Sequence, residues 1–446
     1  MAKAPETRYA KTPDGAYLAY QVVGEGPVDL VWQFDFFGNV DAVWEQPETA
    51  AWLHGLAAFS RLILHDRRGT GLSSRNVPPP NLETRVDDLR SLLDTIDVGR
   101  VVLAGAMEGG APNALFAAAE PERVRSMVWW GATARSTWAP DYPWGVDAAY
   151  EQGWQQAIGD HWGTDAFGEA FRQVEGAAGH TIDPASASII GRMSRHTATP
   201  DVALELARIW NETDVRGVLP SVHVPTLVLW LEDASNVEEV AYAASLIPSG
   251  ELCLLPGSQE GTPEVRSAAM DAIRSFIGIA APAIGLDTIL STVLFTDIVG
   301  STQIQAARGD RGWKELVLAH HAVVREALER WRGVENDTAG DGFYATFDGP
   351  ARAIRCAMEV TERVRPLGIE VRAGVHTGEC ELIDDKCGGL TVSIGARVAS
   401  NAGPSDVLVS QTVKDLVAGS GLAFDDAGEY ELKGVPDRWR LYRVVG

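Results

Sequence analysis

The sequence of 446 residues is long enough for two or three domains. Its composition, 46% hydrophobic and 22% charged, is that of a soluble globular protein, and no apolar run approaches the roughly 20 residues of a membrane span. The formal net charge of −23 argues against broad binding to nucleic acid or to anionic membranes. An anionic ligand would therefore need a local cationic site or metal ions.

The N-terminal stretch MAKAPETRYAKTPDG has no apolar core, so we expect no secretion signal. The four cysteines, Cys253, Cys356, Cys380 and Cys387, include no CxxC pair and are too few for a disulfide framework. These features predict a cytoplasmic protein in a reducing compartment.

The first 275 or so residues alternate strand-like and helix-like segments. The short apolar runs are VDLVW (28–32), RLILHD (61–66), RVVLAG (100–105), SMVWWG (126–131), PTLVLWL (225–231) and GELCLL (250–255). Helical patterns such as NLETRVDDLRSLLDTI (81–96) lie between several of them. Buried strands that alternate with helices predict a mostly parallel sheet covered on both faces.

Residues 132–210 interrupt this alternation and indicate a helical insertion over the sheet, rich in Trp and Tyr. The tryptophans in and beside it are Trp129, Trp130, Trp138, Trp144, Trp154 and Trp162. Two interpretations are open. These side chains line a pocket for a small apolar ligand, or they form core and lid packing, which is the commoner use of aromatic residues.

We place a linker at residues 281–288, between a first domain (1–280) and a second domain (289–446). The sequence pattern of the second domain predicts a strand, a long amphipathic helix (312–333), two strands around a turn at 340–342 and a helix (350–367). A strand (371–379), a helix near 392–402, a strand (406–410) and a closing hairpin follow. This order is typical of an α+β domain.

Two acidic turns in the second domain indicate chemistry. Asp297 ends an apolar strand in VLFTDIVGST (293–302), and Asp341 lies between Gly340 and Gly342. Either feature alone is usually structural, a cap or a turn. On neighbouring strands they would present two carboxylates at one edge of a sheet, which suits two hard divalent ions. The small residues after Asp297 would leave backbone amides for phosphate oxygens.

In chain order, VLFTDIVGST, AGDGF, VRAGVHTGE, VSIGARVA and ELKGV resemble the motifs of class III nucleotide cyclase catalytic domains. The resemblance covers about residues 290–446. It implies a ferredoxin-like βαββαβ core that works as a homodimer, with active sites at the interface. It also implies conversion of a nucleoside triphosphate into a 3′,5′-cyclic monophosphate and pyrophosphate.

The resemblance further implies roles for individual residues. Asp297 and Asp341, with the carbonyl of Ile298, would hold two Mg²⁺ or Mn²⁺ ions, one of which activates the ribose 3′-hydroxyl. Arg397 would come from the other subunit and stabilise charge on the transferring phosphorus. The implied substrate-binding residues are Phe295, Thr296, Val299, Gly300, Ser301, Thr302, Asp337, Gly340, Lys386 and Lys433, and the implied catalytic residues are Arg397 and Ser393.

Three positions depart from the family pattern. Asp337 stands where a base-reading Lys is usual, Lys386 where its Asp partner is usual, and Ser393 where a ribose-orienting Asn is frequent. Since an acid accepts hydrogen bonds and a lysine donates them, the exchanged pair suits guanine or uracil and still permits adenine. Alternatively Asp337 and Lys386 simply pair with each other. ATP is the expected substrate; the alternatives are a guanylate or uridylate cyclase, or a degenerate cyclase that binds nucleotide without turnover.

Residues 8–277 resemble the α/β-hydrolase fold through strand order and the segments DRRGTGLSS (66–74), GAMEGG (105–110), PTLVLWLED (225–233) and LPGSQEG (255–261). In the nucleophile elbow of that fold Met107 stands at the Ser position, and a thioether is no acyl nucleophile. Asp233 lies about where the triad acid would be, and Glu260 replaces the His. Gln33-Phe34 replaces the His-Gly near the oxyanion hole. The resemblance thus implies an inactive hydrolase domain with a binding, scaffolding or regulatory role, not an esterase.

Three histidines of the second domain receive structural interpretations. His320 and His321 are adjacent on the long helix and point different ways, so they make a poor metal pair. We interpret both as helix-surface or dimer-contact residues. His376, in VHTGE, is expected to support the site structurally.

Overall fold

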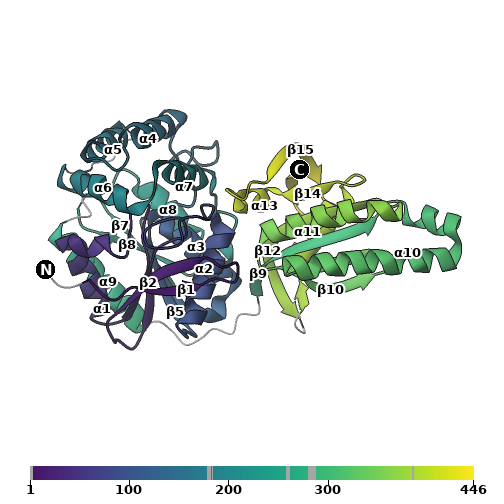
Figure 1. The fold of residues 1–446 in the computed structure, drawn as a ribbon, viewed down its shortest axis with the longest axis horizontal. Helices are drawn as coiled ribbons and strands as arrows, with labels where there is room; N and C mark the ends of the chain where they lie inside the picture. The colour runs from purple at the N-terminus through teal and green to yellow at the C-terminus, as the bar shows by residue number, and fades with distance from the viewer. Residues whose placement is uncertain are drawn as a thin grey trace. The chain divides into compact units, whose positions relative to one another are not determined.

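The computed structural model describes residues 4–177, 182, 184–257, 262–279, 288–383 and 386–445. The chain divides into two compact units, residues 1–285 and 286–446 (Figure 1). The predicted linker at 281–288 lies outside the described residues except for Thr288, which already belongs to a strand. Within the described ranges, no helix combines the length and the apolar character that a membrane crossing needs.

A sheet in the order β1-β2-β4-β3-β5-β6-β7-β8 forms the centre of the first unit. Its strands are β1 (Arg8–Lys11), β2 (Tyr17–Val23), β3 (Asp29–Gln33), β4 (Arg61–His65), β5 (Val101–Ala106), β6 (Val124–Trp130), β7 (Thr226–Leu231) and β8 (Gly250–Leu255). The six predicted strands are confirmed as β3 to β8, and all pairings among them are parallel. The antiparallel strands β1 and β2 at the edge were not predicted.

Helices flank this sheet and form the predicted insertion. The flanking helices are α1 (Pro47–Ala57), α2 (Leu82–Thr95), α3 (Gly110–Ala119), α8 (Val237–Ser245) and α9 (Pro263–Ile279). The insertion comprises α4 (Ala148–His161), α5 (Asp165–Ala177), α6 (Pro184–Thr197) and α7 (Pro200–Glu212), which gather together in Figure 1. The helix expected at 81–96 is α2, and the side chain of Asn81 caps it by accepting from the amide of Thr84 at 2.9 Å.

The second unit is built on a sheet whose strands run in the order β10-β11-β9-β12-β14-β16-β15, with β13 paired to β12. The strands are β9 (Thr288–Ile298), β10 (Val334–Ala339), β11 (Gly342–Phe347), β12 (Val371–Ile383), β13 (Lys386–Gly388), β14 (Val407–Ser410), β15 (Ala423–Glu431) and β16 (Arg438–Val445). The order β10-β11-β9-β12, with one helix after β9 and one after β11, confirms the predicted ferredoxin-like core.

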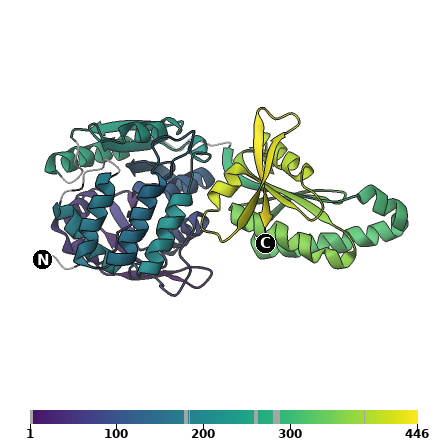
Figure 2. The same cartoon turned by 90° about the horizontal axis from the view of Figure 1, so that it is seen from above.

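Two long helices, α10 (Ser301–Trp331) and α11 (Pro350–Arg363), pack on one face of this sheet and share its apolar core. The long helix begins at Ser301, well before the predicted start at residue 312. Gly309 interrupts it with a non-helical φ of 69° and ψ of 167°, and the bend is visible in the green helix of Figure 2. This break also interrupts the amphipathic period, which is why the sequence pattern located only the second part.

Two shorter helices complete the unit: α12 (Leu390–Ser400) and α13 (Gln411–Leu416). Helix α12 packs on the face of the sheet opposite α10 and α11. A Cβ at Gly374 on β12 would lie 2.1 Å from the amide nitrogen of Ala399, and one at Gly395 on α12 would lie 2.4 Å from a methyl carbon of Val293. Glycine at both positions therefore permits the backbone of α12 to approach the sheet.

Candidate functional site

The candidate site lies on the sheet face that α12 only partly covers. Along β9, Leu294 enters the core beneath α10 and α11, so Phe295 and Asp297 point to the opposite face. The strand register gives each a partner: Phe295 lies opposite Tyr344 on β11, and Asp297 lies opposite Arg372 on β12. Three strands distant in sequence thus bring these side chains together.

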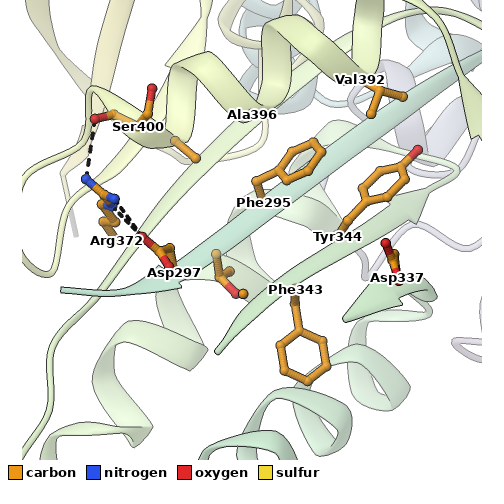
Figure 3. Close-up of a pocket in the computed structure, with 12 residues that line it drawn as sticks. Phe295, Asp297, Asp337, Phe343, Tyr344, Arg372, Val392, Ala396 and Ser400 are labelled. Carbon is orange, nitrogen blue, oxygen red and sulfur yellow. Dashed lines mark hydrogen bonds and ion pairs between the residues drawn. The ribbon is translucent and has the colours of Figure 1, made fainter. Parts of the chain in front are cut away.

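A pocket of about 420 Å³ opens on this face, and Figure 3 shows the side chains around it. The rings of Phe295 and Tyr344 stack with centroids 4.7 Å apart and planes 4° apart. Of the predicted site residues, the pocket brings together Phe295, Thr296, Asp297 and Asp337. Its lining is Phe295, Thr296, Asp297, Asp337, Gly342, Phe343, Tyr344, Arg372, Val392, Ala396, Ala399 and Ser400.

The two predicted metal carboxylates meet at the end of β9. Asp341 lies in the two-residue turn between β10 and β11, where Gly340 has the φ of 66° that such a turn requires. An Asp341 oxygen accepts from the amide of Ile298 at 3.3 Å. Burial and the nearby negative charge of Asp297 raise the pKa of Asp341 above its ordinary value of 3.8. This coupling through space is the electrostatic sign of two carboxylates that share one site.

Asp297 already interacts with a cation of its own chain. Its carboxylate accepts from Arg372 Nε at 3.1 Å and from Arg372 Nη2 at 2.6 Å, and both side chains are about one-third exposed (Figure 3). The third guanidinium nitrogen, Nη1, donates to the carbonyl of Ser400 at 3.4 Å. The pocket therefore combines an acidic end with one positive side chain suited to an anionic ligand.

The donor set at the strand end fits hard divalent cations. Two carboxylates and the Ile298 carbonyl are oxygen ligands, which Mg²⁺ and Mn²⁺ prefer. Among the described residues, no group of three or more His, Cys, Asp or Glu side chains could hold a metal ion. Phosphate or water oxygens would therefore have to complete the coordination.

The predicted phosphate-binding amides divide into two kinds. Gly300, with a φ of 69°, precedes the first turn of α10, so the amides of Gly300, Ser301 and Thr302 have no helical carbonyl to bond. Such a helix start attracts anions. The amide of Val299 instead donates to the carbonyl of Glu370 at 2.9 Å, so it already has a partner, and a part for Val299 in substrate binding stays a prediction.

Of the two predicted base-reading residues, the structure describes the side chain of one. Asp337 follows a β-bulge on β10, lies opposite Tyr344 and lines the pocket. Lys386 begins β13, where its backbone pairs with Ile383, and its side chain lies outside the described part of the chain. Recognition of the nucleobase by Asp337 and Lys386, with their charges exchanged relative to the family pattern, therefore stays a prediction. Direct pairing of these two side chains stays a prediction as well.

Ser393, Arg397 and Lys433 form a second group, separate from the pocket of their own chain. Ser393 and Arg397 lie one turn apart on the exposed side of α12, and Lys433 is exposed beyond β15. Arg397 Nε donates to the carbonyl of Lys433 at 3.2 Å. None of the three lines the pocket described above. One chain thus presents the acidic group, Asp297 and Asp341, and the basic group, Arg397 and Lys433, at different places.

Sequence reasoning missed Arg372 and Tyr344. The signal for Arg372 was available, because in VRAGVHTGE it alternates with the buried Val371 and Ala373 and must point away from the core. Tyr344 alternates in the same way between Phe343 and Ala345. Only the register of β9 against β11 and β12 reveals which partners these side chains meet.

The interpretation of His320 as a surface residue was wrong. Its side chain is fully buried against the ring of Phe343, and burial lowers its pKa to about 4. His321 is half-buried, and its Nε2 lies 3.0 Å from the carbonyl oxygen of Gly340 in the Asp341 turn. His376 is buried, with its Nδ1 2.8 Å from the hydroxyl of Ser410, in line with the expected structural role.

In the first unit, the elbow keeps its geometry around a residue that is no nucleophile. Met107 has a left-handed φ of 47° between β5 and α3, and Trp129 donates to its carbonyl at 2.9 Å. The neighbouring Glu108 is buried and pairs with Arg67 and with Arg85. Gln33 donates to the side chain of Asn113 at 2.6 Å.

The remaining predicted triad positions give no catalytic arrangement that the structure describes. Asp233 follows β7 and is exposed. Glu260, the residue expected in place of the His, lies outside the described residues.

The aromatic residues of the insertion pack mainly against one another. Trp154 stacks on Phe37 with centroids 6.0 Å apart, and Trp162 meets Phe36 and Phe167 edge-on at 6.0 and 4.8 Å. Trp129 is fully buried in the sheet, whereas Trp138 is 54% exposed. These contacts favour the packing interpretation, and the apolar-ligand pocket stays a prediction.

Comparison with known families agrees with both halves of this description. Residues 287–446 match the model for the adenylate and guanylate cyclase catalytic domain, and residues 38–259 match the model for the alpha/beta hydrolase fold. The chain therefore joins an α/β-hydrolase fold to a class III cyclase catalytic domain.

Individual relatives match parts of the chain. An uncharacterized protein of Mycobacterium tuberculosis is 33% identical over 152 residues, covering 32% of this chain and 52% of that protein. The receptor-type adenylate cyclase GRESAG 4.3 of Trypanosoma brucei brucei is 26% identical over 204 residues, covering 34% of this chain and 16% of that protein. The chain thus spans about half the length of the first relative and a small part of the second.

Among solved structures, a bromoperoxidase from Bacillus anthracis is similar with a TM-score of 0.51 and 22% identity. The match covers 61% of this chain and 100% of the bromoperoxidase chain. It supports the α/β fold of the first unit.

Proposed function

We propose that this chain is a nucleotide cyclase, which converts a nucleoside triphosphate, with ATP as first choice, into a 3′,5′-cyclic monophosphate and pyrophosphate. The observation that carries the proposal is the meeting of Asp297 and Asp341 at the end of β9, beside the first amides of α10. A cyclase catalytic domain and an adenylate cyclase relative point to the same reaction.

Asp297, Asp341 and the carbonyl of Ile298 would hold two Mg²⁺ or Mn²⁺ ions. When bound, these ions supply acidification of the ribose 3′-hydroxyl and charge neutralisation of the triphosphate. The raised pKa of Asp341 supports this role, because a cation relieves the repulsion between the two carboxylates.

Arg372 would change partners when substrate binds. In the free chain its guanidinium neutralises Asp297. With a metal ion on that carboxylate, the guanidinium of Arg372 would lie beside the triphosphate and could bind its oxygens. The amides of Gly300, Ser301 and Thr302 would bind phosphate at the helix start.

The base would lie against the aromatic wall formed by Phe295 and Tyr344, with Asp337 at its edge. A carboxylate accepts hydrogen bonds, so Asp337 would bind N–H groups of the base. Adenine, guanine and uracil all offer such donors. The choice of ATP therefore rests on the family resemblance, and GTP and UTP are the alternatives.

The active site would be completed by a second copy of the chain. Arg397 and Lys433 are exposed and separate from the pocket of their own chain, yet a triphosphate needs their charge. A homodimer would bring them, with Ser393, to the acidic group of the partner. The first unit, without a Ser nucleophile at its elbow, would regulate this domain.

The test is a product assay on the full chain with Mn²⁺ and ATP, GTP, UTP or CTP offered separately. Mass spectrometry should find one dominant 3′,5′-cyclic nucleotide. Asp297→Asn should abolish it, since a neutral amide cannot replace a metal-binding carboxylate, and Asp271→Asn in the first unit is the matched control. Nucleotide binding without product from any of the four would favour the degenerate-cyclase alternative.

A further inference from the structure

Two of the four cysteines lie side by side at the edge of the candidate nucleotide pocket. Strands β12 and β13 form an antiparallel hairpin in which Cys387 lies opposite position 382. Cys380 is two residues earlier on β12, which makes it the diagonal neighbour of Cys387 on the same face. This register places the two side chains next to each other on one face of the hairpin.

The two thiols differ in reactivity and access. The interactions with Cys380 and Ser291 lower the pKa of the Cys387 thiol, whereas the interaction with Cys387 and burial raise the pKa of the Cys380 thiol. Cys387 is partly exposed, and Cys380 is fully buried. An accessible thiol with thiolate character beside a protected one is the arrangement of an oxidisable dithiol.

Cys387 is also hydrogen-bonded to a residue that lines the pocket. Its carbonyl accepts from the hydroxyl of Tyr344 at 2.8 Å, and the ring of Tyr344 stacks on Phe295. The preceding residue in the chain is Lys386, one of the two predicted base-reading residues. A displacement of the Cys387 backbone would therefore reach the surface against which the base is proposed to lie.

We propose that Cys380 and Cys387 form a reversible disulfide that weakens nucleotide binding in the adjacent pocket. The oxidant is a peroxide. The Cys387 thiolate attacks one peroxide oxygen, so that an S–O bond forms, the O–O bond breaks and the departing oxygen is protonated. Cys380 then attacks the resulting sulfenic sulfur, an S–S bond replaces the S–O bond, and water leaves with the Cys380 proton. A thiol reductant reverses the reaction by exchange.

Closing the bond must move the backbone. Diagonal residues on paired strands have Cα atoms about 7–8 Å apart, whereas a disulfide joins Cα atoms that are at most about 6.8 Å apart. Formation of the disulfide would displace Cys387 and with it β13. It would also disturb the hydrogen bond between the carbonyl of Cys387 and the hydroxyl of Tyr344. The effect on nucleotide rests on the proposed function, whereas formation of the disulfide does not.

The first arm of the experiment maps the bond in the full-length protein. Reduced protein is treated with hydrogen peroxide, free thiols are alkylated, and peptides are analysed by mass spectrometry. We expect a Cys380–Cys387 linked peptide that dithiothreitol removes, present in Cys356→Ser and absent in Cys387→Ser. If Cys387 ends as a sulfinic acid while Cys380 stays alkylated as a free thiol, the proposal is overturned.

The second arm measures equilibrium nucleotide binding, not turnover, so that it does not depend on cyclase activity. Oxidation should weaken binding on the order of tenfold, as for a sub-ångström displacement of a positioning group, and reductant should restore it. Cys387→Ser should not respond to peroxide. Equal affinity of the two forms, with the disulfide mapped, would refute the regulatory effect. Absence of binding in the reduced protein would refute the proposed function, while the peptide map still decides the disulfide.

Discussion

The ion pair between Asp297 and Arg372 shows how single residues prepare this site. Both side chains are about one-third exposed, so solvent screens the pair and its net stabilisation is small. A divalent ion, with twice the charge of a guanidinium, would compete with Arg372 for the same carboxylate in the proposed site. The pair therefore neutralises Asp297 in the free chain without opposing metal binding strongly.

Met107, at the serine position of the nucleophile elbow, gives a prediction about ester hydrolysis by the first unit. Met107→Ser should restore a serine at the left-handed position without creating a hydrolase, because no histidine is predicted to take its proton. The activation that a triad supplies, about 10⁶-fold in turnover, is then missing. Hydrolysis of p-nitrophenyl acetate should equal that of the Met107→Ala control. Ester hydrolysis that appears only in the serine variant would contradict this reading.

The buried His320 gives a prediction about pH and stability. Its folded-state pKa of about 4 lies below the ordinary 6.5. The unfolded chain therefore binds more protons between these values, and stability is lost as pH falls through this window, by on the order of 3 kcal/mol for this group. His320→Leu should flatten the dependence of the melting temperature on pH, as followed by calorimetry.

The control for that measurement is Leu328→Met, a substitution in the same core that introduces no titrating group. It should shift the melting temperature without altering the slope against pH. An unchanged slope in His320→Leu would mean that the histidine is not buried as described.

At the scale of elements, the position of α12 depends on its close approach to β12. The helix provides Val392, Ala396 and Ala399 as one wall of the pocket, and it carries the exposed Arg397, which does not line the pocket. Because this wall and the exposed Arg397 belong to one helix, a small displacement of α12 would disturb the pocket and the proposed contribution of Arg397 to a partner's site together.

Gly374→Ala tests that dependence. The added Cβ would lie 2.1 Å from the backbone nitrogen of Ala399, so α12 has to move away. We expect a loss of roughly 1–3 kcal/mol in the stability of the second unit, as for other overpacked sites, together with weaker nucleotide binding. Denaturant unfolding and nucleotide titration measure the two effects.

The matched control is Gly312→Ala in α10, where only the Cβ of Arg308 comes near, at 3.2 Å. Replacing a helical glycine should be neutral or stabilising by up to about 1 kcal/mol. Equal behaviour of the two variants would show that the approach of α12 is not limiting.

At the scale of the whole molecule, the acidic and basic groups of the proposed active site belong to different places on one chain. A homodimer that pairs them predicts complementation. Asp297→Asn and Arg397→Ala should each be nearly inactive alone. Mixed dimers contain one intact site of two, and they make up about half of the population if exchange is random, so the mixture should recover roughly a quarter of wild-type activity.

Product formation after the two inactive variants are mixed and re-equilibrated measures this recovery. A mixture of Asp297→Asn with Asp341→Asn is the control, because both changes lie in the same half-site and no intact site can form. Recovery in the control, or none in the test mixture, would contradict a site shared between two copies.

The sequence by itself determined the elements and the chemistry of the loops. Apolar runs located β3 to β8, because period and turn chemistry are local properties. Asp297, Asp341 and the glycine turn of Gly340 were identified for the same reason. The two particular folds were expected from the resemblance of motifs such as VLFTDIVGST and DRRGTGLSS to known families. The predicted start of the long helix was wrong, because the break at Gly309 interrupts the helical period of the sequence.

The tertiary structure decided everything that depends on register and packing. Arg372 meets Asp297, and Tyr344 meets Phe295, only because β9 pairs with β12 and β11 in one register. His320 is buried because α10 turns that side toward Phe343, although the next residue, His321, is only half-buried. Cys380 and Cys387 become neighbours through a hairpin pairing. Such contacts join residues far apart in sequence or related only by strand pairing, and no local pattern of the chain encodes them.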